Sequence, residues 1–226
     1  MLEKWLGLTL CSFGAMGLLG LRLGDVSISL PKPSLDGKVS VEKAIKERRT
    51  IRDFKTQPLS LAQLSQLLWS AQGITDPREG KRAAPSGGAL FPLDIYLIMG
   101  GNSVEGLEAG VYHYLPEKHS ISLVTKEDRR KEIASASLWQ TWMAGAPVLF
   151  IITAEYRRIT GKYGERGIRY ALMEVGHVGQ NLFLQAEALG LGAGIVGAFN
   201  DLEVSKVVGL PPKHEPLLIM PVGYKK

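Results

Sequence analysis

Three arginines and a threonine lie within five residues, and side chains of these types are suited to binding an anion. The segment reads Arg48-Arg49-Thr50-Ile51-Arg52 and falls between a helical pattern and an extended one. A guanidinium group binds phosphate through two parallel hydrogen bonds, and a threonine hydroxyl adds another donor. The cluster therefore predicts a phosphate site, with a solvated helix end that complements the helix dipole as the alternative.

A loop of small residues is the second feature that favours ligand binding. Ala84–Pro92 reads Ala-Pro-Ser-Gly-Gly-Ala-Leu-Phe-Pro and leads into the largely apolar run Leu93–Met99. Glycines allow the backbone to approach a ligand closely. An ordinary turn before a strand has the same composition, so the loop alone leaves both interpretations open.

The elements that must position these segments follow from hydrophobic periodicity. Ser40 is a candidate N-cap for a helix over Val41–Arg48, and Ser60-Leu61-Ala62-Gln63 has the pattern of a capping box. The strongest helical pattern is Arg169–Leu189, with an apolar face that includes Leu172 and Leu182. Extended runs rich in apolar residues predict strands at Ile95–Met99, Val148–Thr153 and Leu217–Met220, and a hairpin at Gly110–Tyr114 and Ile121–Val124. Without a regular βαβ repeat, these elements predict an α+β fold with helices around a mostly antiparallel sheet.

Composition limits the classes of function. The chain has 226 residues, 45% of them hydrophobic, and a net charge of +5, which suits one globular domain with an anionic ligand. The sequence has no stretch in which aromatic and basic residues alternate, so it does not predict nucleic-acid binding. The single cysteine, Cys11, excludes an intrachain disulfide. The histidines show no metal-ligand spacing, and the chain has no Walker loop, Ser-His-Asp arrangement or Rossmann fingerprint.

The N-terminus has a different character from the rest of the chain. Trp5–Leu21 carries no charge and is short for a bilayer span, so a signal peptide, a membrane anchor and a buried helix are the alternatives. We favour an exported or membrane-tethered protein, with a cytoplasmic location otherwise. The predicted organisation is a hydrophobic segment over residues 1–24, a linker or extended arm over 25–38 and the folded domain over 39–226.

Several motifs occur in an order that carries a family resemblance. The Arg48–Arg52 cluster and the Ala84–Pro92 loop are followed by Gly190–Phe199, by Val207–Pro211 and by a terminal Pro221–Tyr224. This order resembles the flavin-dependent nitroreductase superfamily. The segment Lys162–Tyr170, with the Gly176-His177 and Gln180-Asn181-Leu182 motifs, resembles its SagB-type dehydrogenase branch, which includes azoline oxidases of thiazole/oxazole-modified peptides. The resemblance runs from about Val39 to the end of the chain.

The resemblance implies a nitroreductase-like fold and a homodimer with FMN at the interface. It assigns Arg48, Thr50 and Arg52 to the FMN phosphate and ribityl chain, with Arg49 as a further contact. Lys225 lies where many members place another basic phosphate ligand, although a solvated tail is the alternative. The loop residues that it places against the flavin are Pro85, Ser86, Gly87, Gly88 and Leu90, with Ser86 as a hydrogen-bond donor.

In related enzymes, the stretch corresponding to Ile195-Val196-Gly197-Ala198 covers one face of the flavin ring. A backbone N–H near the Gly197 position then points at flavin N5, where it stabilises the reduced cofactor. Many nitroreductases have a Glu-Gly pair here, whereas Gly197-Ala198 fits the SagB-type branch better.

Lys162 and Tyr163 match a Lys-Tyr pair implicated in the azoline oxidases of this branch. Conversion of a thiazoline to a thiazole removes a hydride from one carbon and a proton from its neighbour. A partly desolvated lysine has a lowered pKa and can take that proton, while Tyr163 orients or relays it. A surface lysine beside a packing tyrosine is the alternative.

Three functions remain open at this stage. The first is an FMN-dependent oxidoreductase that transfers hydride through flavin N5, with NAD(P)H or the substrate as donor and a small molecule or peptide as substrate. The second is an azoline peptide oxidase with oxygen as acceptor. The third is a membrane-tethered flavin-binding module without turnover.

Overall fold

The computed structural model describes residues 27–226 of the chain. Within this range, no helix is long and apolar enough to cross a membrane. This finding corrects the predicted location in a membrane or after export. The hydrophobic segment Trp5–Leu21, on which that prediction rested, lies outside the described residues, so no membrane tether is shown.

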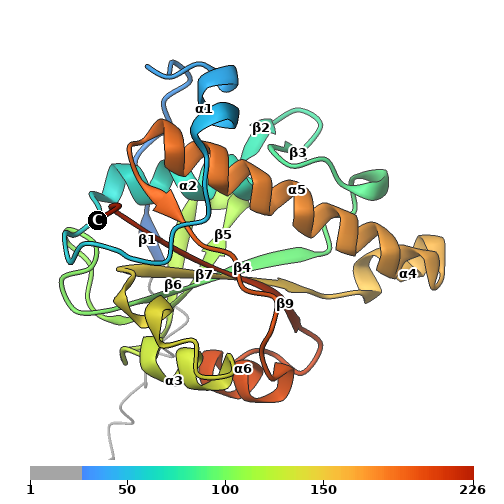
Figure 1. The fold of residues 1–226 in the computed structure, drawn as a ribbon. Coiled ribbons are helices and arrows are strands. Elements are labelled where there is room, and N and C mark those ends of the chain that lie inside the picture. Colours follow the sequence, from blue (N-terminus) through green and yellow to red (C-terminus); the bar gives the residue numbers. More distant parts are fainter. Residues whose placement is uncertain (1–26) are drawn as a thin grey trace, which may run out of the picture.

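A seven-stranded sheet forms the centre of the fold (Figure 1). Its strand order is β1-β6-β5-β4-β7-β9-β8, and every neighbouring pair in it is antiparallel. The strands are β1 (Ser27–Ser29), β4 (Leu93–Met99), β5 (Gly110–Leu115), β6 (Ser120–Thr125), β7 (Val148–Ala154), β8 (Gly192–Ala193) and β9 (Glu215–Gly223). The predicted α+β class and the predicted β5–β6 hairpin are therefore confirmed.

Helices cover both faces of this sheet (Figure 1). On one face lie α1 (Val41–Glu47), α2 (Leu61–Gln72) and α5 (Arg166–Ala188), and on the other lie α3 (Arg130–Ala136) and α6 (Asp201–Val208). The short α4 (Arg157–Tyr163) lies beside the N-terminal end of α5. Both faces of β4 and β7 are thus covered, which explains why these strands are almost continuously apolar.

The helix starts follow the capping signals in the sequence. The Ser40 side chain accepts the Lys43 N–H at α1. At α2, the Ser60 and Gln63 side chains and backbones exchange the two hydrogen bonds of a capping box. Each cap satisfies backbone donors that the first helical turn leaves without partners.

Some local structure was not predicted from the sequence. The polar stretch Gly73–Arg82 contains a small hairpin of β2 (Ile74–Asp76) and β3 (Lys81–Arg82). Helix α5 starts three residues earlier than predicted, and Leu172, expected on its apolar face, is 49% exposed while Glu174 is buried. The N-terminal half of α5 therefore turns apolar side chains outward.

Candidate functional site

The arginine segment lies against the C-terminal part of the chain. Thr50 forms a parallel bridge with Ala193 in β8, and the Ile51 N–H donates to the Ala193 carbonyl at 2.9 Å. Two predicted cofactor segments that lie more than 140 positions apart in the sequence are therefore adjacent in space. The adjacency requires Gly194, because a Cβ there would come within 2.8 Å of the Ile51 carbonyl oxygen.

The guanidinium groups of this segment differ in how they are engaged. Arg48 stacks over the Phe183 ring at 5.0 Å, and Arg52 lies 5.7 Å from the Trp142 ring centroid. Neither forms a salt bridge with a carboxylate within residues 27–226. Arg49 instead donates to the carbonyls of Lys46 and Arg48, both at 2.8 Å. Arg48 and Arg52 therefore keep their charge available for an anion.

Lys225, the other predicted phosphate ligand, is paired within the chain. Its ammonium lies 2.6 and 2.7 Å from the two carboxylate oxygens of Glu187, whose side chain is 10% exposed. A Cβ at Gly192 would contact both Lys225 Cγ and the Ile51 side chain, so the lysine lies close to the arginine segment. Its charge is already balanced by a carboxylate.

The Ile195–Ala198 segment exposes backbone at the position predicted to face the flavin. Val196 exchanges hydrogen bonds with Ile219 of β9 at 2.9 and 3.0 Å, which fixes the segment to the sheet. Gly197 and Ala198 are exposed, and a Cβ at Gly197 would meet no atom within 4 Å. The open space beside Gly197 can accommodate a planar group.

The Pro85–Phe91 loop adopts an unusual backbone. The glycine in its 3₁₀ turn, η2 (Gly87–Ala89), is left-handed with φ of 64° at Gly88, and two larger residues, Ala89 and Phe91, have φ of 54° and 44°. The Ser86 Oγ accepts the Phe91 N–H at 2.9 Å. Residues other than glycine rarely adopt these angles, and such strain clusters at functional sites.

Helix α4 carries the predicted catalytic pair against this loop. A Cβ at Gly88 would come within 2.6 Å of the Tyr163 hydroxyl and 3.2 Å of the Lys162 ammonium. Tyr163 packs edge-on against Tyr170 at 5.1 Å, whereas Lys162 is exposed. The structure therefore brings Lys162 and Tyr163 to the loop that was predicted to contact the flavin.

The loop and the arginine segment contact the same helix. The Pro85 carbonyl lies 3.4 Å from His177 Nδ1, and Arg48 stacks on Phe183 six residues further along α5. Six residues correspond to roughly 9 Å along a helix axis. Helix α5 thus sets the separation between the two groups of predicted site residues.

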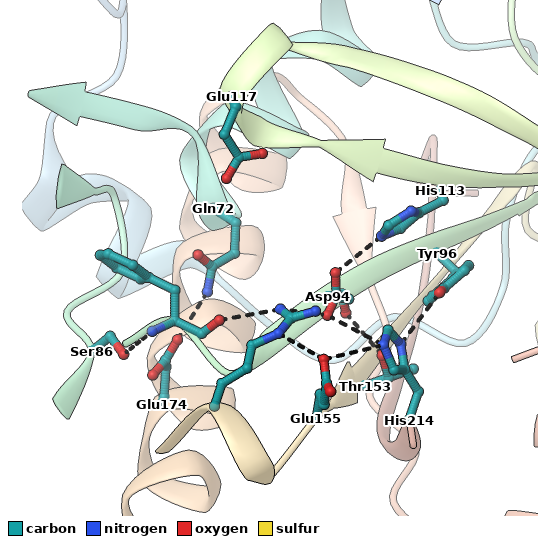
Figure 2. Close-up of polar contacts among 12 residues, drawn as sticks. Gln72, Ser86, Asp94, Tyr96, His113, Glu117, Thr153, Glu155, Glu174 and His214 are labelled. Atoms are coloured by element: carbon teal, nitrogen blue, oxygen red, sulfur yellow. Dashed lines mark hydrogen bonds and ion pairs between the residues drawn. The ribbon is translucent and has the colours of Figure 1, made fainter. Parts of the chain in front are cut away.

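Two carboxyl groups beside the loop, one buried and one largely shielded from solvent, were not predicted as site residues (Figure 2). Glu174 of α5 is 1% exposed, accepts a hydrogen bond from Gln72 at 3.2 Å, and its second oxygen has no partner among the described residues. Burial raises the pKa of Glu174, although the Ser86 and Gln72 side chains oppose the shift.

Asp94 is the second of these groups, and its surroundings act in the opposite direction. Burial alone raises the pKa of Asp94, but the His113 hydrogen bond and the Arg158 charge outweigh it and leave that pKa below its usual range. The one available signal in the sequence was a lone carboxylate within the apolar run Leu93–Met99. A cavity of about 400 Å³ adjoins this group and is lined by residues that include Leu90, Phe91, His113 and Arg158.

Comparison with known proteins agrees with this geometry. The model of the nitroreductase family matches residues 45–224. MJ1384 of Methanocaldococcus jannaschii, which is named as a nitroreductase, is 44% identical over 203 residues, which cover 90% of this chain and 99% of MJ1384. These matches confirm the predicted family.

A second similarity is to proteins that are named for the processing or synthesis of microcin. The microcin B17-processing protein McbC of Escherichia coli is 31% identical over 169 residues, which cover 73% of this chain and 62% of McbC. A chain in the solved E. coli microcin synthetase McbBCD complex, with truncated pro-MccB17 bound, aligns with a TM-score of 0.67 at 25% identity, covering 96% of this chain and 85% of that one. The predicted resemblance to the SagB-type branch is thereby confirmed.

Proposed function

Because the chain belongs to the nitroreductase family, we propose that it is an FMN-dependent oxidoreductase. The observation that carries the proposal is the contact between Ile51 and Ala193, which places the arginine segment beside the Ile195–Ala198 segment. One segment offers a phosphate the guanidinium groups of Arg48 and Arg52, which form no salt bridge among the described residues, and the other offers open backbone to a ring. FMN supplies the redox chemistry when bound, since it accepts a hydride at N5 and passes on two electrons.

The residues of the site fit this cofactor. Arg48, Thr50 and Arg52 bind the phosphate and ribityl chain, and Arg49 contributes positive charge at the same end. Lys225 joins them only by exchanging Glu187 for the phosphate. The Gly197 N–H has no acceptor among the described residues and is free to donate to the ring, with Ile195, Val196 and Ala198 around it. A Cβ at Gly88 would come within 2.6 Å of the Tyr163 hydroxyl, so this glycine lets α4 approach the loop that we propose to contact the ring.

We propose that the enzyme is a homodimer with the cofactor near the interface. Helix α5 exposes Ile168, Leu172 and Met173 at 39%, 49% and 55%. Large exposed apolar side chains that lie close together are typical of protein interfaces. The loop residues Pro85–Leu90 then contact either the flavin of their own chain or that of the partner.

The relationship to McbC favours a peptide azoline as the substrate. The second candidate is a general reductase whose electron donor is NAD(P)H. In azoline oxidation, Lys162 takes the proton from the ring carbon next to the one that loses hydride. Because Lys162 is exposed in the chain alone, the bound substrate must supply the desolvation that this role requires. The Lys162 amine, which must be neutral to accept this proton, and the Tyr163 hydroxyl both lie beside Gly88 at the end of α4. Oxygen accepts the two electrons that the azoline loses, and the five-membered ring becomes aromatic.

The substitution Lys162→Ala tests the azoline proposal. We expect loss of azoline oxidation by about 10²–10⁴-fold, the range for a general acid–base group, with FMN content unchanged. Mass spectrometry of a thiazoline peptide measures the loss of two hydrogens, and absorbance measures the flavin. Lys131→Ala, an exposed lysine on α3 across the sheet, is the matched control. An unchanged oxidation rate in Lys162→Ala would contradict the base role.

Bleaching of the flavin by NADH or NADPH separates the two substrate candidates. A reductase that uses a nicotinamide donor bleaches anaerobically with one of these donors and recovers in air. An azoline oxidase bleaches with the thiazoline peptide instead. A bound flavin that is bleached neither by a nicotinamide nor by the thiazoline peptide would contradict both proposed reactions.

A further inference from the structure

Phe91 is the residue at which the strained loop is fastened to the rest of the molecule. Its backbone is left-handed, with φ of 44°, and three groups hold it. The Ser86 Oγ accepts its N–H at 2.9 Å, Arg158 donates to its carbonyl at 3.4 Å, and the Arg82 guanidinium stacks over its ring at 4.6 Å. A bulky residue adopts such a backbone only where its surroundings fix it.

Arg158 is the only one of these three groups that belongs to the helix carrying the predicted catalytic pair. Its Nη1 lies 2.8 Å from Asp94 Oδ2, in an ion pair rather than an aligned hydrogen bond, and its Nε donates to Glu155 Oε2 at 2.9 Å (Figure 2). One guanidinium therefore joins α4, the sheet and the loop. Arginine suits this task because its planar group presents several donors in fixed directions.

The sheet provides a rigid anchor for this contact. Asp94 lies in β4, which pairs with β7 along its whole length and with β5 from Tyr96 to Met99, and its side chain is only 12% exposed. His113 on β5 holds the other carboxylate oxygen at 3.1 Å. The carboxylate is thus fixed from two strands before Arg158 reaches it.

Arg158 stands one helical turn before Lys162 on α4. This helix has seven residues and no side-chain N-cap, so its own hydrogen bonds hold it weakly. We propose that Arg158 is a positioning residue that locks α4 to the Phe91 turn, so that Lys162 and Gly88 keep their mutual position. The role of Lys162 rests on the proposed function. The contact of α4 with the Phe91 turn does not depend on that function.

An exposed ion pair would be the ordinary role for an arginine such as this one, and such pairs contribute little. The arrangement differs in that the same guanidinium also contacts a main-chain carbonyl of a strained turn. Loss of an ordinary ion pair would loosen α4 alone. Loss of a lock would loosen α4 and the loop together.

Hydrogen exchange of the full chain without added ligand tests the lock. In Arg158→Ala, we expect amide exchange to rise at least tenfold in both segments, 85–92 and 157–163, while β4 stays protected. Arg158→Lys keeps the charge but loses the planar fork, and it should restore only part of the protection. Arg157→Ala, the exposed neighbour, is the matched control and should leave both segments unchanged. Exchange that rises in 157–163 alone, or in neither segment, would overturn the proposal.

A kinetic measurement on the FMN-loaded protein distinguishes a loss of positioning from a general loss of stability. We expect Arg158→Ala to lower kcat for the oxidised substrate at least tenfold while KM and FMN content change less than twofold. A rise in KM with unchanged kcat would contradict the positioning role. Failure of the wild-type chain to bind FMN would contradict the proposed function, and the exchange experiment would still decide the lock.

Discussion

The two ends of the proposed flavin site are built from different parts of the protein. The phosphate end consists of charged side chains, Arg48 and Arg52, that rest on aromatic rings and have no carboxylate partner among the described residues. The ring end consists of backbone, with left-handed residues at Gly88 and Phe91 and exposed amides at Gly197. One end can bind through charge without exact loop geometry, whereas the other depends on a conformation that the surrounding network must hold.

The largest effect is expected from removing the charges of the phosphate end. The double substitution Arg48→Ala/Arg52→Ala should weaken FMN binding at least about 100-fold, since each charge-assisted hydrogen bond contributes about 1.5–3 kcal/mol. Riboflavin lacks the phosphate, so its binding should change much less. Fluorescence titration with both flavins measures the difference. Arg49→Ala should have a smaller effect, because that side chain donates to carbonyls of its own helix end. Equal losses of affinity for FMN and riboflavin would contradict the assignment of Arg48 and Arg52 to the phosphate.

A smaller effect is expected at the ring end, and it should not depend on the phosphate. Gly88→Ala places a Cβ near Tyr163 and adds a side chain to a left-handed residue, which costs about 1–2 kcal/mol. We expect FMN and riboflavin affinity to fall together, by roughly tenfold. Gly101→Ala, where a Cβ meets open space, is the matched control in titration and thermal unfolding. Selective loss of FMN binding would contradict the assignment of Gly88 to the ring.

The smallest effects concern Asp94 and Glu174, the two carboxyl groups beside the ring end. Asp94 has a lowered pKa in the folded chain, so its contribution to stability is present above the unfolded pKa and is lost as the pH falls through the folded pKa. Asp94→Asn should therefore destabilise the protein near neutral pH, and the difference should shrink in acid. Denaturant unfolding across pH measures this trend.

Glu174 should behave in the opposite way. Its pKa is raised in the folded chain, so the folded state binds more protons than the unfolded state and loses stability as the pH rises from the unfolded to the folded pKa. Glu174→Gln removes this loss, and its stability relative to wild type should increase with pH over that window. Parallel pH trends for the two variants would show that the partners of these carboxyls do not differ as described.

The residues of the proposed phosphate end are easier to recognise in a sequence than those of the ring end, for a physical reason. Charged residues clustered in five positions are visible in a sequence, and capping boxes and apolar runs predicted α2, β4 and β7. The strain at Phe91 and the ion pair from Arg158 to Asp94 depend on contacts between distant segments. Neither the burial of Glu174 nor the exposure of Leu172 follows from the period of α5, because that helix meets different neighbours along its length.

The most direct test of the account is the cofactor that the 226-residue chain retains. We would purify residues 1–226, record the visible absorbance spectrum, and identify the released cofactor by mass. The account predicts FMN at near-stoichiometric occupancy, with riboflavin bound more weakly on reconstitution. A colourless protein that FMN does not reconstitute, or one that binds both flavins equally, would contradict a site in which Arg48 and Arg52 hold the phosphate.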